Sequence, residues 1–273
     1  MLKNKVKMTL ALMAVMTVNM FADDGSDVAE MARKLQDPLA NIKMVMFDNG
    51  VDFQTGNDDI SYSFSVQPVY AIPMETYNLI LRGVIPIVGL SPGAQKPIIG
   101  EPLPPGRSDT WGISDSQLQM FFSPKSDSDW KWGVGPLISL KTHTDAKLEG
   151  AGWGGGAAAV LVGSFSENIS FSMVAGHTEG EHGFSTSFVQ PMLYYNVSSI
   201  EGMAISYNNT STYNHQARSK NAWTVPLGMT VSRTFVMESG IGLDLGIGYY
   251  NNVKRPKGAA DWTLKWSVAI VFP

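Results

Sequence analysis

The stretch HTEGEH at residues 177–182 brings together four side chains that could bind a metal ion: His177, Glu179, Glu181 and His182. Imidazole nitrogens and carboxylate oxygens are ligands of zinc and similar ions. Such a short, acidic stretch is more typical of a solvated loop, however. The chain contains no cysteine, which excludes thiolate ligands and disulfide bonds. We therefore expect neither a bound metal ion nor a cofactor.

Hydrolytic chemistry would require a serine, a histidine and an acid held next to one another. The four histidines are His143, His177, His182 and His215, and all fall in or beside segments that we expect to form long loops. None is evidently placed on a strand with a serine and an acid, as barrel phospholipases require. The sequence therefore predicts that the protein is not an enzyme.

Two glutamines stand in closely similar stretches, SFSVQPVY at residues 63–70 and TSFVQPMLYY at residues 186–195. Each glutamine, Gln67 and Gln190, precedes a proline, which gives up a hydrogen bond of the strand ladder. Because a closed barrel must bend its strands, a proline has a physical place in such a sheet. Two interpretations stay open: the pair marks a repeated bend near a rim, or the glutamines line a substrate path.

The strand segments alternate between large apolar residues and small or polar ones. In residues 261–272 the apolar face consists of Trp262, Leu264, Trp266, Val268, Ile270 and Phe272. Charged residues make up only 16% of the chain, and glycine, serine and threonine dominate the opposite faces. Apolar side chains outside and small polar ones inside are typical of a transmembrane β-barrel. A soluble lipocalin-like barrel or sandwich is the alternative.

Twelve strands are predicted, near 42–53, 60–73, 77–89, 113–123, 130–142, 153–164, 168–177, 184–197, 200–210, 220–234, 240–250 and 261–272. Connections after even strands are short and those after odd strands are long, as in barrels with short periplasmic turns and long external loops. The fold class is therefore all-β: a transmembrane antiparallel up-and-down β-barrel of about twelve strands with a short N-terminal helix.

The N-terminal region divides into two parts ahead of a barrel at 41–273. Residues 1–22 combine lysines, an apolar stretch and a final alanine, which predicts a cleaved secretory signal peptide. Because this leader carries three lysines and no acid, its removal lowers the net charge from −4 to −7, which disfavours nucleic-acid binding. Residues 23–40 are expected to form a periplasmic segment with an amphipathic helix, which plugs the lumen, lies at the rim or remains a mobile tail.

Polar residues in the inward phase are the candidate lumen-lining positions. An arginine facing hydrocarbon at mid-depth would cost about 2 to 4 kcal/mol, so Arg82 should turn inward, where it borders a wet path or pairs with Asp115. The candidate substrate path consists of Gln67, Arg82, Asp115, Gln117, Gln119, Lys131, Lys141, Gln190, Asp244 and Lys265.

Eight stretches, spread over nearly the whole chain after the leader, form a specific set: QDPLANI, SVQPVYAIP, YNLILRGVIPI, QLQMFFSPK, WGVGPLISL, FVQPMLYYN, WTVPLGM and the ending VFP. Together they resemble the MetA-pathway of phenol degradation family of bacterial outer-membrane proteins. This resemblance implies an outer-membrane β-barrel that passes small organic solutes, including aromatic or hydrophobic ones. Pro273 behind Phe272 departs from the terminal aromatic residue of many such barrels, which bears on recognition by the assembly machinery.

Two functional classes follow from these observations. The first is a channel or transporter with outer-membrane lipid, small organic solutes and, during biogenesis, the outer-membrane assembly machinery as partners. The second is a non-conducting structural or receptor-like barrel whose lumen is filled by side chains and the N-terminal segment.

Overall fold

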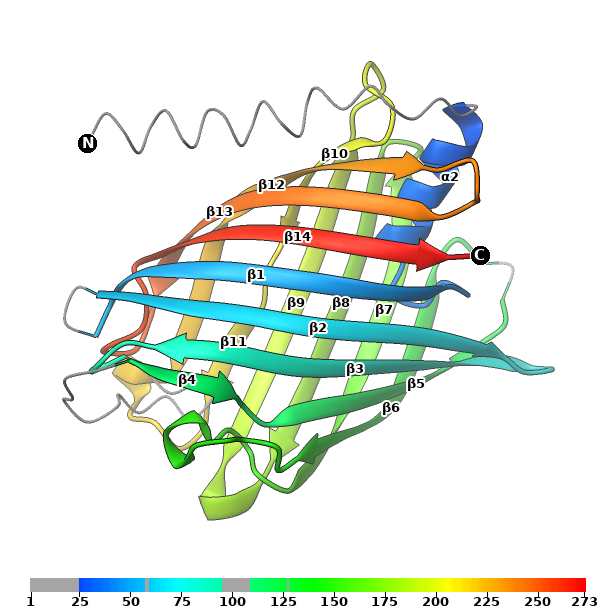
Figure 1. The fold of residues 1–273 in the computed structure, drawn as a ribbon. Helices are drawn as coiled ribbons and strands as arrows, with labels where there is room; N and C mark the ends of the chain where they lie inside the picture. The colour runs from blue at the N-terminus through cyan, green and yellow to red at the C-terminus, as the bar shows by residue number, and fades with distance from the viewer. Residues whose placement is uncertain (1–24, 57–58, 95–108, 127) are drawn as a thin grey trace, which may run out of the picture.

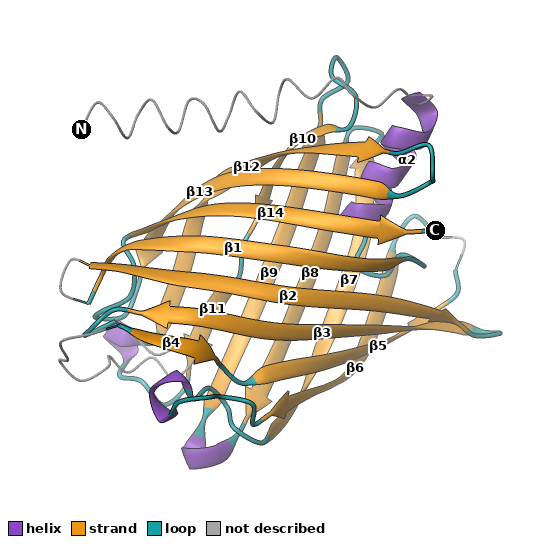
Figure 2. Cartoon of the chain, in the orientation of Figure 1, coloured by secondary structure: helices purple, strands orange, loops and turns teal. Residues whose placement is uncertain are grey.

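The computed structural model describes residues 25–56, 59–94, 109–126 and 128–273, and these form a β-barrel with one α-helix (Figures 1 and 2). The predicted signal peptide at 1–22 lies outside the described residues. The strands in the described ranges are β1 (Lys43–Thr55), β2 (Asp59–Pro73), β3 (Tyr77–Leu90), β4 (Thr110–Ile113), β5 (Ser116–Pro124), β6 (Lys131–Leu140), β7 (Gly154–Ser166), β8 (Ile169–Glu179), β9 (Ser185–Asn196), β10 (Met203–Asn208), β11 (Ser211–Asn214), β12 (Trp223–Val236), β13 (Gly242–Lys254) and β14 (Trp262–Phe272).

The strands form one closed antiparallel sheet of fourteen described segments. Neighbours in sequence pair with one another around the barrel, and β14 pairs with β1 to close it. Two positions in the wall are shared: β4 continues into β5 alongside β3, and β10 and β11 both lie between β9 and β12. The fourteen segments therefore occupy twelve positions, which confirms the predicted twelve-stranded barrel.

The two interruptions were not predicted. The expected single strand at 113–123 breaks at Ser114 and Asp115, and the expected strand at 200–210 breaks at Asn209 and Thr210. Each break releases a polar side chain from the strand ladder: Asp115 binds the loop between β6 and β7, and Asn209 contacts Lys265.

Apolar side chains cover the outside of the barrel. In β2, Tyr62 and Tyr70 are exposed while Ser61, Gln67 and Ala71 are buried. Strands such as β14, which alternates in the same way, were predicted to place their aromatic residues outward, and Trp266 and Phe272 are indeed exposed. Exposing so many apolar side chains to water would be unfavourable, whereas contact with lipid would not. Closure and the apolar exterior together exclude the soluble sandwich.

The interior differs between the two ends of the barrel. Toward the short turns, inward side chains pack into an apolar cluster: Val69, Ala71, Ile80, Phe121, Ala158, Val160, Val162, Val174, Met192 and Tyr194. Leu39, which precedes β1, inserts into this cluster and is almost completely buried. Small or polar residues were expected to dominate the inner faces, with a filled lumen as the alternative; this half is filled by aliphatic and aromatic groups, because a barrel of this width lets side chains from opposite walls meet.

The helix α2 (Gly25–Gln36) docks at the short-turn end, where Figure 1 also shows the C-terminus. Gln36 Nε2 donates to Asn196 Oδ1 at 2.7 Å, and Ser172 Oγ donates to the Gln36 carbonyl at 3.2 Å. Beyond the helix, Asp37 pairs with Lys131 at 3.3 Å. We call residues 25–40 the plug segment, because they bring Leu39 into the apolar cluster. No helix in the described ranges is long and apolar enough to cross a membrane.

Candidate functional site

A cavity of about 580 Å³ occupies the lumen on the long-loop side of the apolar cluster. Almost every strand contributes to its wall, and segments between β13 and β14, including Gly258 and Ala259, reach it from the loop end. Side chains with hydroxyl or amide groups make up about half of its lining. A site of this size and polarity fits a small organic molecule.

Four charged side chains line the cavity among the described residues, and their charges cancel: Asp48, Asp52, Arg82 and Lys265. They come from β1, β3 and β14, which lie close together in the wall, so these four charges lie on one side of the cavity. Alternating acids and bases set up a local field across the lumen that would orient a dipolar solute.

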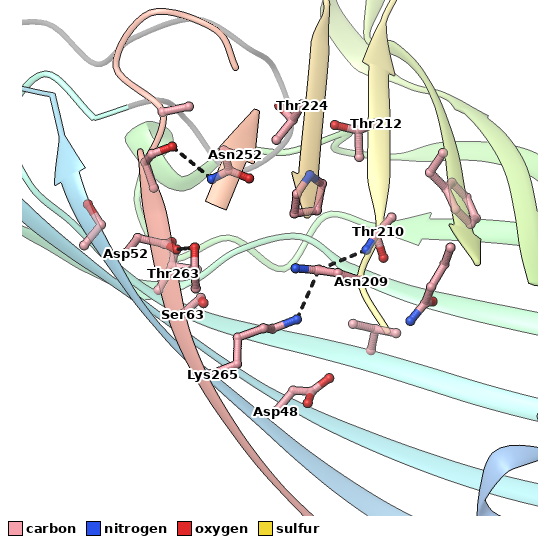
Figure 3. A pocket seen from close by; sticks show the side chains of 18 of the residues that line it. Asp48, Asp52, Ser63, Asn209, Thr210, Thr212, Thr224, Asn252, Thr263 and Lys265 are labelled. Atoms are coloured by element: carbon pink, nitrogen blue, oxygen red, sulfur yellow. Dashed lines mark hydrogen bonds between the residues drawn. The ribbon is translucent and has the colours of Figure 1, made fainter. Parts of the chain in front are cut away.

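Lys265 reaches across the lumen to Asn209, and both of its partners in the sheet are glycines. In the sheet it lies between Gly50 of β1 and Gly248 of β13. A Cβ atom at Gly50 would come within 2.6 Å of Ser63 Oγ, so no larger residue fits there without a shift. The ammonium of Lys265 donates to Asn209 Oδ1 at 3.2 Å, and Figure 3 shows this bridge.

The two aspartates and Arg82 are held by polar neighbours. Thr263 Oγ1 donates to Asp52 Oδ1 at 2.5 Å. Gln67 bridges Asp48 and Arg82: its amide nitrogen donates to Asp48 Oδ2 at 3.2 Å, and its side-chain carbonyl accepts from Arg82 at 2.6 Å. These contacts fix the charged groups in place, which lets them act on a solute without first reorganising.

The facing wall supplies neutral hydrogen-bonding groups. Thr210, Thr212 and Thr224 point toward the cavity in Figure 3, and Gln190 Nε2 donates to Asn208 Oδ1 at 2.9 Å. The break between β10 and β11 turns Asn209 inward, toward Lys265. Sequence reasoning missed Asn209 because an unbroken strand at 200–210 was expected; the dipeptide Asn208-Asn209 was the available signal, since asparagine favours turns.

The structure divides the ten predicted lining residues into two groups. Six line the cavity: Gln67, Arg82, Gln117, Gln119, Gln190 and Lys265. Four lie elsewhere: Asp115, Lys131, Lys141 and Asp244. Lys131 pairs with Asp37 of the plug segment, and Lys141 pairs with Glu181 at 2.7 Å near the outer rim.

The remaining two acids also have local partners. Asp244 accepts a hydrogen bond from Thr234 Oγ1 at 2.8 Å. The expected alternative of an Arg82–Asp115 pair is not seen, because Arg82 binds Gln67 and Asp115 lies at the strand break.

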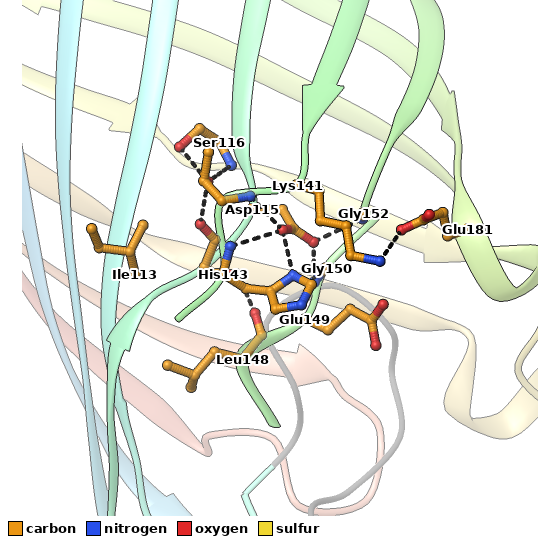
Figure 4. A network of polar contacts seen from close by, with 12 residues as sticks. Ile113, Asp115, Ser116, Lys141, His143, Leu148, Glu149, Gly150, Gly152 and Glu181 are labelled. Carbon is orange, nitrogen blue, oxygen red and sulfur yellow. Dashed lines mark hydrogen bonds and ion pairs between the residues drawn. The ribbon is translucent and has the colours of Figure 1, made fainter. Parts of the chain in front are cut away.

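Asp115 is the centre of a buried polar network (Figure 4), with only 1% of the residue exposed. Its Oδ1 accepts from the backbone nitrogens of Thr142 at 3.1 Å and His143 at 3.2 Å, and lies 2.7 Å from His143 Nδ1. Its Oδ2 accepts from the backbone nitrogens of Gly150 and Gly152, both at 2.7 Å. One carboxylate therefore holds both ends of the loop between β6 and β7.

Asp115 lies at the long-loop end of the wall, since it precedes the terminal pair of the β5–β6 ladder, Ser116 with Leu140, and binds loop residues beyond it. Burial by itself would raise the pKa of Asp115. The hydrogen bonds from Gly152, His143 and Gly150 outweigh that effect and hold its pKa below the ordinary value of an aspartate.

One histidine lies where it was not expected. His177 is part of β8, on the outer face of the barrel, and its Nδ1 lies 2.9 Å from Ser187 Oγ in β9. The expectation that no histidine is placed on a strand with a serine and an acid is therefore wrong for His177, whose Nε2 also lies 3.5 Å from Glu179 Oε1. The predicted strand at 168–177 already ended on His177; what alternation within one strand does not determine is the register of β8 against β9, which pairs His177 with Ser187. Within the described ranges, no group of three or more histidine, aspartate and glutamate side chains could hold a metal ion.

Comparison with known proteins supports the fold. The chain is similar in structure to the COG4313 outer membrane channel from Pseudomonas putida F1, with a TM-score of 0.59 at 13% identity over 85% of this chain and 96% of that one. It is also similar to the NanC porin, with a TM-score of 0.51 at 10% identity over 84% of this chain and 99% of that one. No protein-family model and no curated protein sequence matches the chain. The fold is thus a closed β-barrel of the kind found in outer-membrane channels.

Proposed function

We propose that the protein is a bacterial outer-membrane channel for small polar organic solutes, and that the described conformation is its closed state. The observation that carries this proposal is the cavity with four balanced charges on one wall and hydroxyl and amide groups on the other. The apolar exterior gives the barrel its lipid contact, and export would use the leader at 1–22 and the outer-membrane assembly machinery. The barrel domain would be 41–273, preceded by the periplasmic segment 23–40.

The family resemblance supports narrower proposals. Membership of the MetA-pathway family would be consistent with the barrel fold and with passage of organic solutes. The proposal that the solutes are aromatic or hydrophobic rests on that resemblance alone, since side chains with hydroxyl or amide groups make up about half of the cavity lining. The second functional class, a non-conducting barrel, is favoured by one observation: the apolar cluster around Leu39 fills the lumen toward the short turns. Single-channel recording in planar bilayers distinguishes the two classes, as set out below.

Replacing Lys265 with glutamine should shift ion selectivity toward cations. Asp48 and Asp52 would lose the positive charge that lies between them along the wall, and the net charge of the lining would become negative. A unit charge at contact distance in water-like surroundings is worth about 1 kcal/mol, or roughly a fivefold change in the permeability ratio. Reversal potentials under a salt gradient, recorded on a variant that also lacks the plug segment, measure this ratio.

Lys141→Gln is the matched control for this measurement. It removes the same charge from the outer rim, where Lys141 pairs with Glu181 outside the cavity, and should change the reversal potential much less. A conducting Lys265→Gln barrel with unchanged selectivity would show that Lys265 does not border the permeation path.

Orientation in the membrane can be tested with single cysteines, because the chain has none of its own. Ser219 in η3 (Ser219–Asn221) lies on a long loop, and Ser199 lies in the short turn between β9 and β10; both are exposed. A membrane-impermeant maleimide added to intact cells should label Ser219→Cys and spare Ser199→Cys until the outer membrane is permeabilised. The reverse pattern would place the long loops in the periplasm and overturn the proposed orientation.

A further inference from the structure

The outer wall carries a polar cluster where β8 and β9 approach the long loops. His177 of β8 and Ser187 of β9 face each other in register, and His215, which follows β11, completes the group. Farther along the same face of β9, Leu193 and Tyr195 are exposed apolar residues. Two imidazoles and a hydroxyl on a wall that is otherwise built to meet lipid call for an explanation, since polar groups there are unfavourable.

The ring nitrogens converge on one oxygen atom. Ser187 Oγ lies 2.9 Å from His177 Nδ1 and 2.9 Å from His215 Nε2. A hydroxyl has one hydrogen, so Ser187 can donate to only one of the two rings. The two rings are nearly perpendicular, with centroids 5.2 Å apart. Two imidazole nitrogens and one hydroxyl oxygen thus lie close together in one cluster.

The carboxylate of Glu179 lies beside the His177 ring, at the nitrogen that does not contact Ser187. The other ring nitrogen, Nε2, lies 3.5 Å from Glu179 Oε1. A carboxylate in this position favours a proton on Nε2, which leaves the lone pair of Nδ1 directed at Ser187. Histidines that bind metals commonly have such a carboxylate behind them, because it fixes the ring and raises its basicity.

We propose that His177 and His215, with Ser187, bind a divalent transition-metal cation of the kind that prefers imidazole, such as Cu²⁺ or Zn²⁺. Ligand atoms at about 2.0 to 2.1 Å from a tetrahedral ion stand roughly 3.3 Å apart, so the observed 2.9 Å spacings need to open only slightly. His215 is exposed and can move by that amount. Water would complete the coordination.

The surroundings place the cation at the edge of the lipid-facing surface. The ring of Tyr213 meets that of His215 edge-on with centroids 4.8 Å apart, and Trp223 lies 4.9 Å from Tyr213. Aromatic residues of this kind collect at the membrane–water interface. His177 keeps 41% of its side chain exposed, so an ion could reach it from the aqueous side.

The test is a Cu²⁺ titration of the untagged protein in detergent micelles. Electron paramagnetic resonance at one equivalent should show coupling to two imidazole nitrogens. His177→Ala and His215→Ala should each lower the affinity at least tenfold and leave coupling to a single nitrogen. Mg²⁺, which prefers oxygen ligands, should not compete even in large excess.

His182→Ala is the matched control, because His182 is exposed on the neighbouring loop and pairs with Glu149 instead. It should bind Cu²⁺ as the unmodified protein does. Glu179→Gln should weaken binding by about tenfold or more, the usual effect of removing such a carboxylate. Heat-dependent gel mobility verifies that each variant forms a closed barrel. Unchanged binding in folded His177→Ala or His215→Ala, or an equal loss in His182→Ala, would overturn the proposal.

Discussion

Replacing Leu39 with alanine should convert a mostly silent barrel into one that opens often. Leu39 is 3% exposed and packs with inward side chains from the surrounding wall, including Ile80 and Phe121. Truncating a buried leucine costs about 2 to 5 kcal/mol, and here that cost falls on the docked plug segment. The ratio of open to closed states should therefore rise by roughly thirtyfold or more. Single-channel recordings in planar bilayers measure it as open probability.

Leu193→Ala is the matched control, since Leu193 faces outward and is 46% exposed. It makes the same truncation without touching the plug segment, and should leave open probability unchanged. Deleting residues 25–40 should give a permanently conducting barrel. If that deletion variant folds and remains silent, the wall side chains alone close the lumen, and the protein belongs to the non-conducting class.

Replacing Asp115 with alanine should release the loop between β6 and β7. Four backbone nitrogens and the His143 ring would lose their shared partner at a buried position, and breaking such a group costs about 3 to 5 kcal/mol. Hydrogen exchange of a peptide covering residues 142–153 should accelerate by roughly two orders of magnitude or more. The control, Asp145→Ala, removes an exposed carboxylate with one hydrogen bond to Lys147 N, and should act only within η1 (Ala146–Leu148). Equal hydrogen-exchange rates of residues 142–153 in Asp115→Ala and Asp145→Ala would show that Asp115 does not hold this loop.

The same loop should loosen in acid. Because the folded state lowers the pKa of Asp115, its ionised form stabilises the docked loop at every pH above the ordinary aspartate range. That contribution falls as the pH drops below about 4 and is lost once the pH passes below the lowered pKa. Hydrogen exchange of residues 142–153, corrected for intrinsic rates, should therefore stay constant from pH 7 to about 5 and rise below about 4. Asp115→Ala should abolish this dependence.

The alternation of residues predicted the barrel because it is a local property. Trp262, Leu264 and Trp266 recur every second position, so their common outward face could be inferred without knowing which strand lies alongside. The strand count followed from the same pattern. Local alternation also placed Gln67 and Gln190 on the inner face, where both now line the cavity.

The features that were missed depend on contacts between distant segments. The pairing of His177 with Ser187 follows from the register of β8 against β9, which one-dimensional alternation does not determine. Asp115 was assigned to the lumen because its strand was assumed to be continuous; the backbone nitrogens that bind it come from a loop more than 25 residues later in the chain. A filled lumen was an open alternative, but the residues that fill it could not be predicted, because Val69, Ile80 and Phe121 meet only after the barrel closes.

Only residues 40–42 separate Leu39 from the start of β1, and the carbonyl of Ile42 accepts a hydrogen bond from the backbone nitrogen of Ala71 in β2. A plug segment on so short a tether cannot diffuse away from the barrel. Its effective concentration at the apolar cluster therefore stays in the millimolar range or above, however dilute the protein is. Closing a short chain segment takes on the order of 10 to 100 ns. Openings of the unmodified barrel should therefore end by rapid recapture, and an amplifier of ordinary bandwidth will register them as brief flickers and excess current noise instead of square steps.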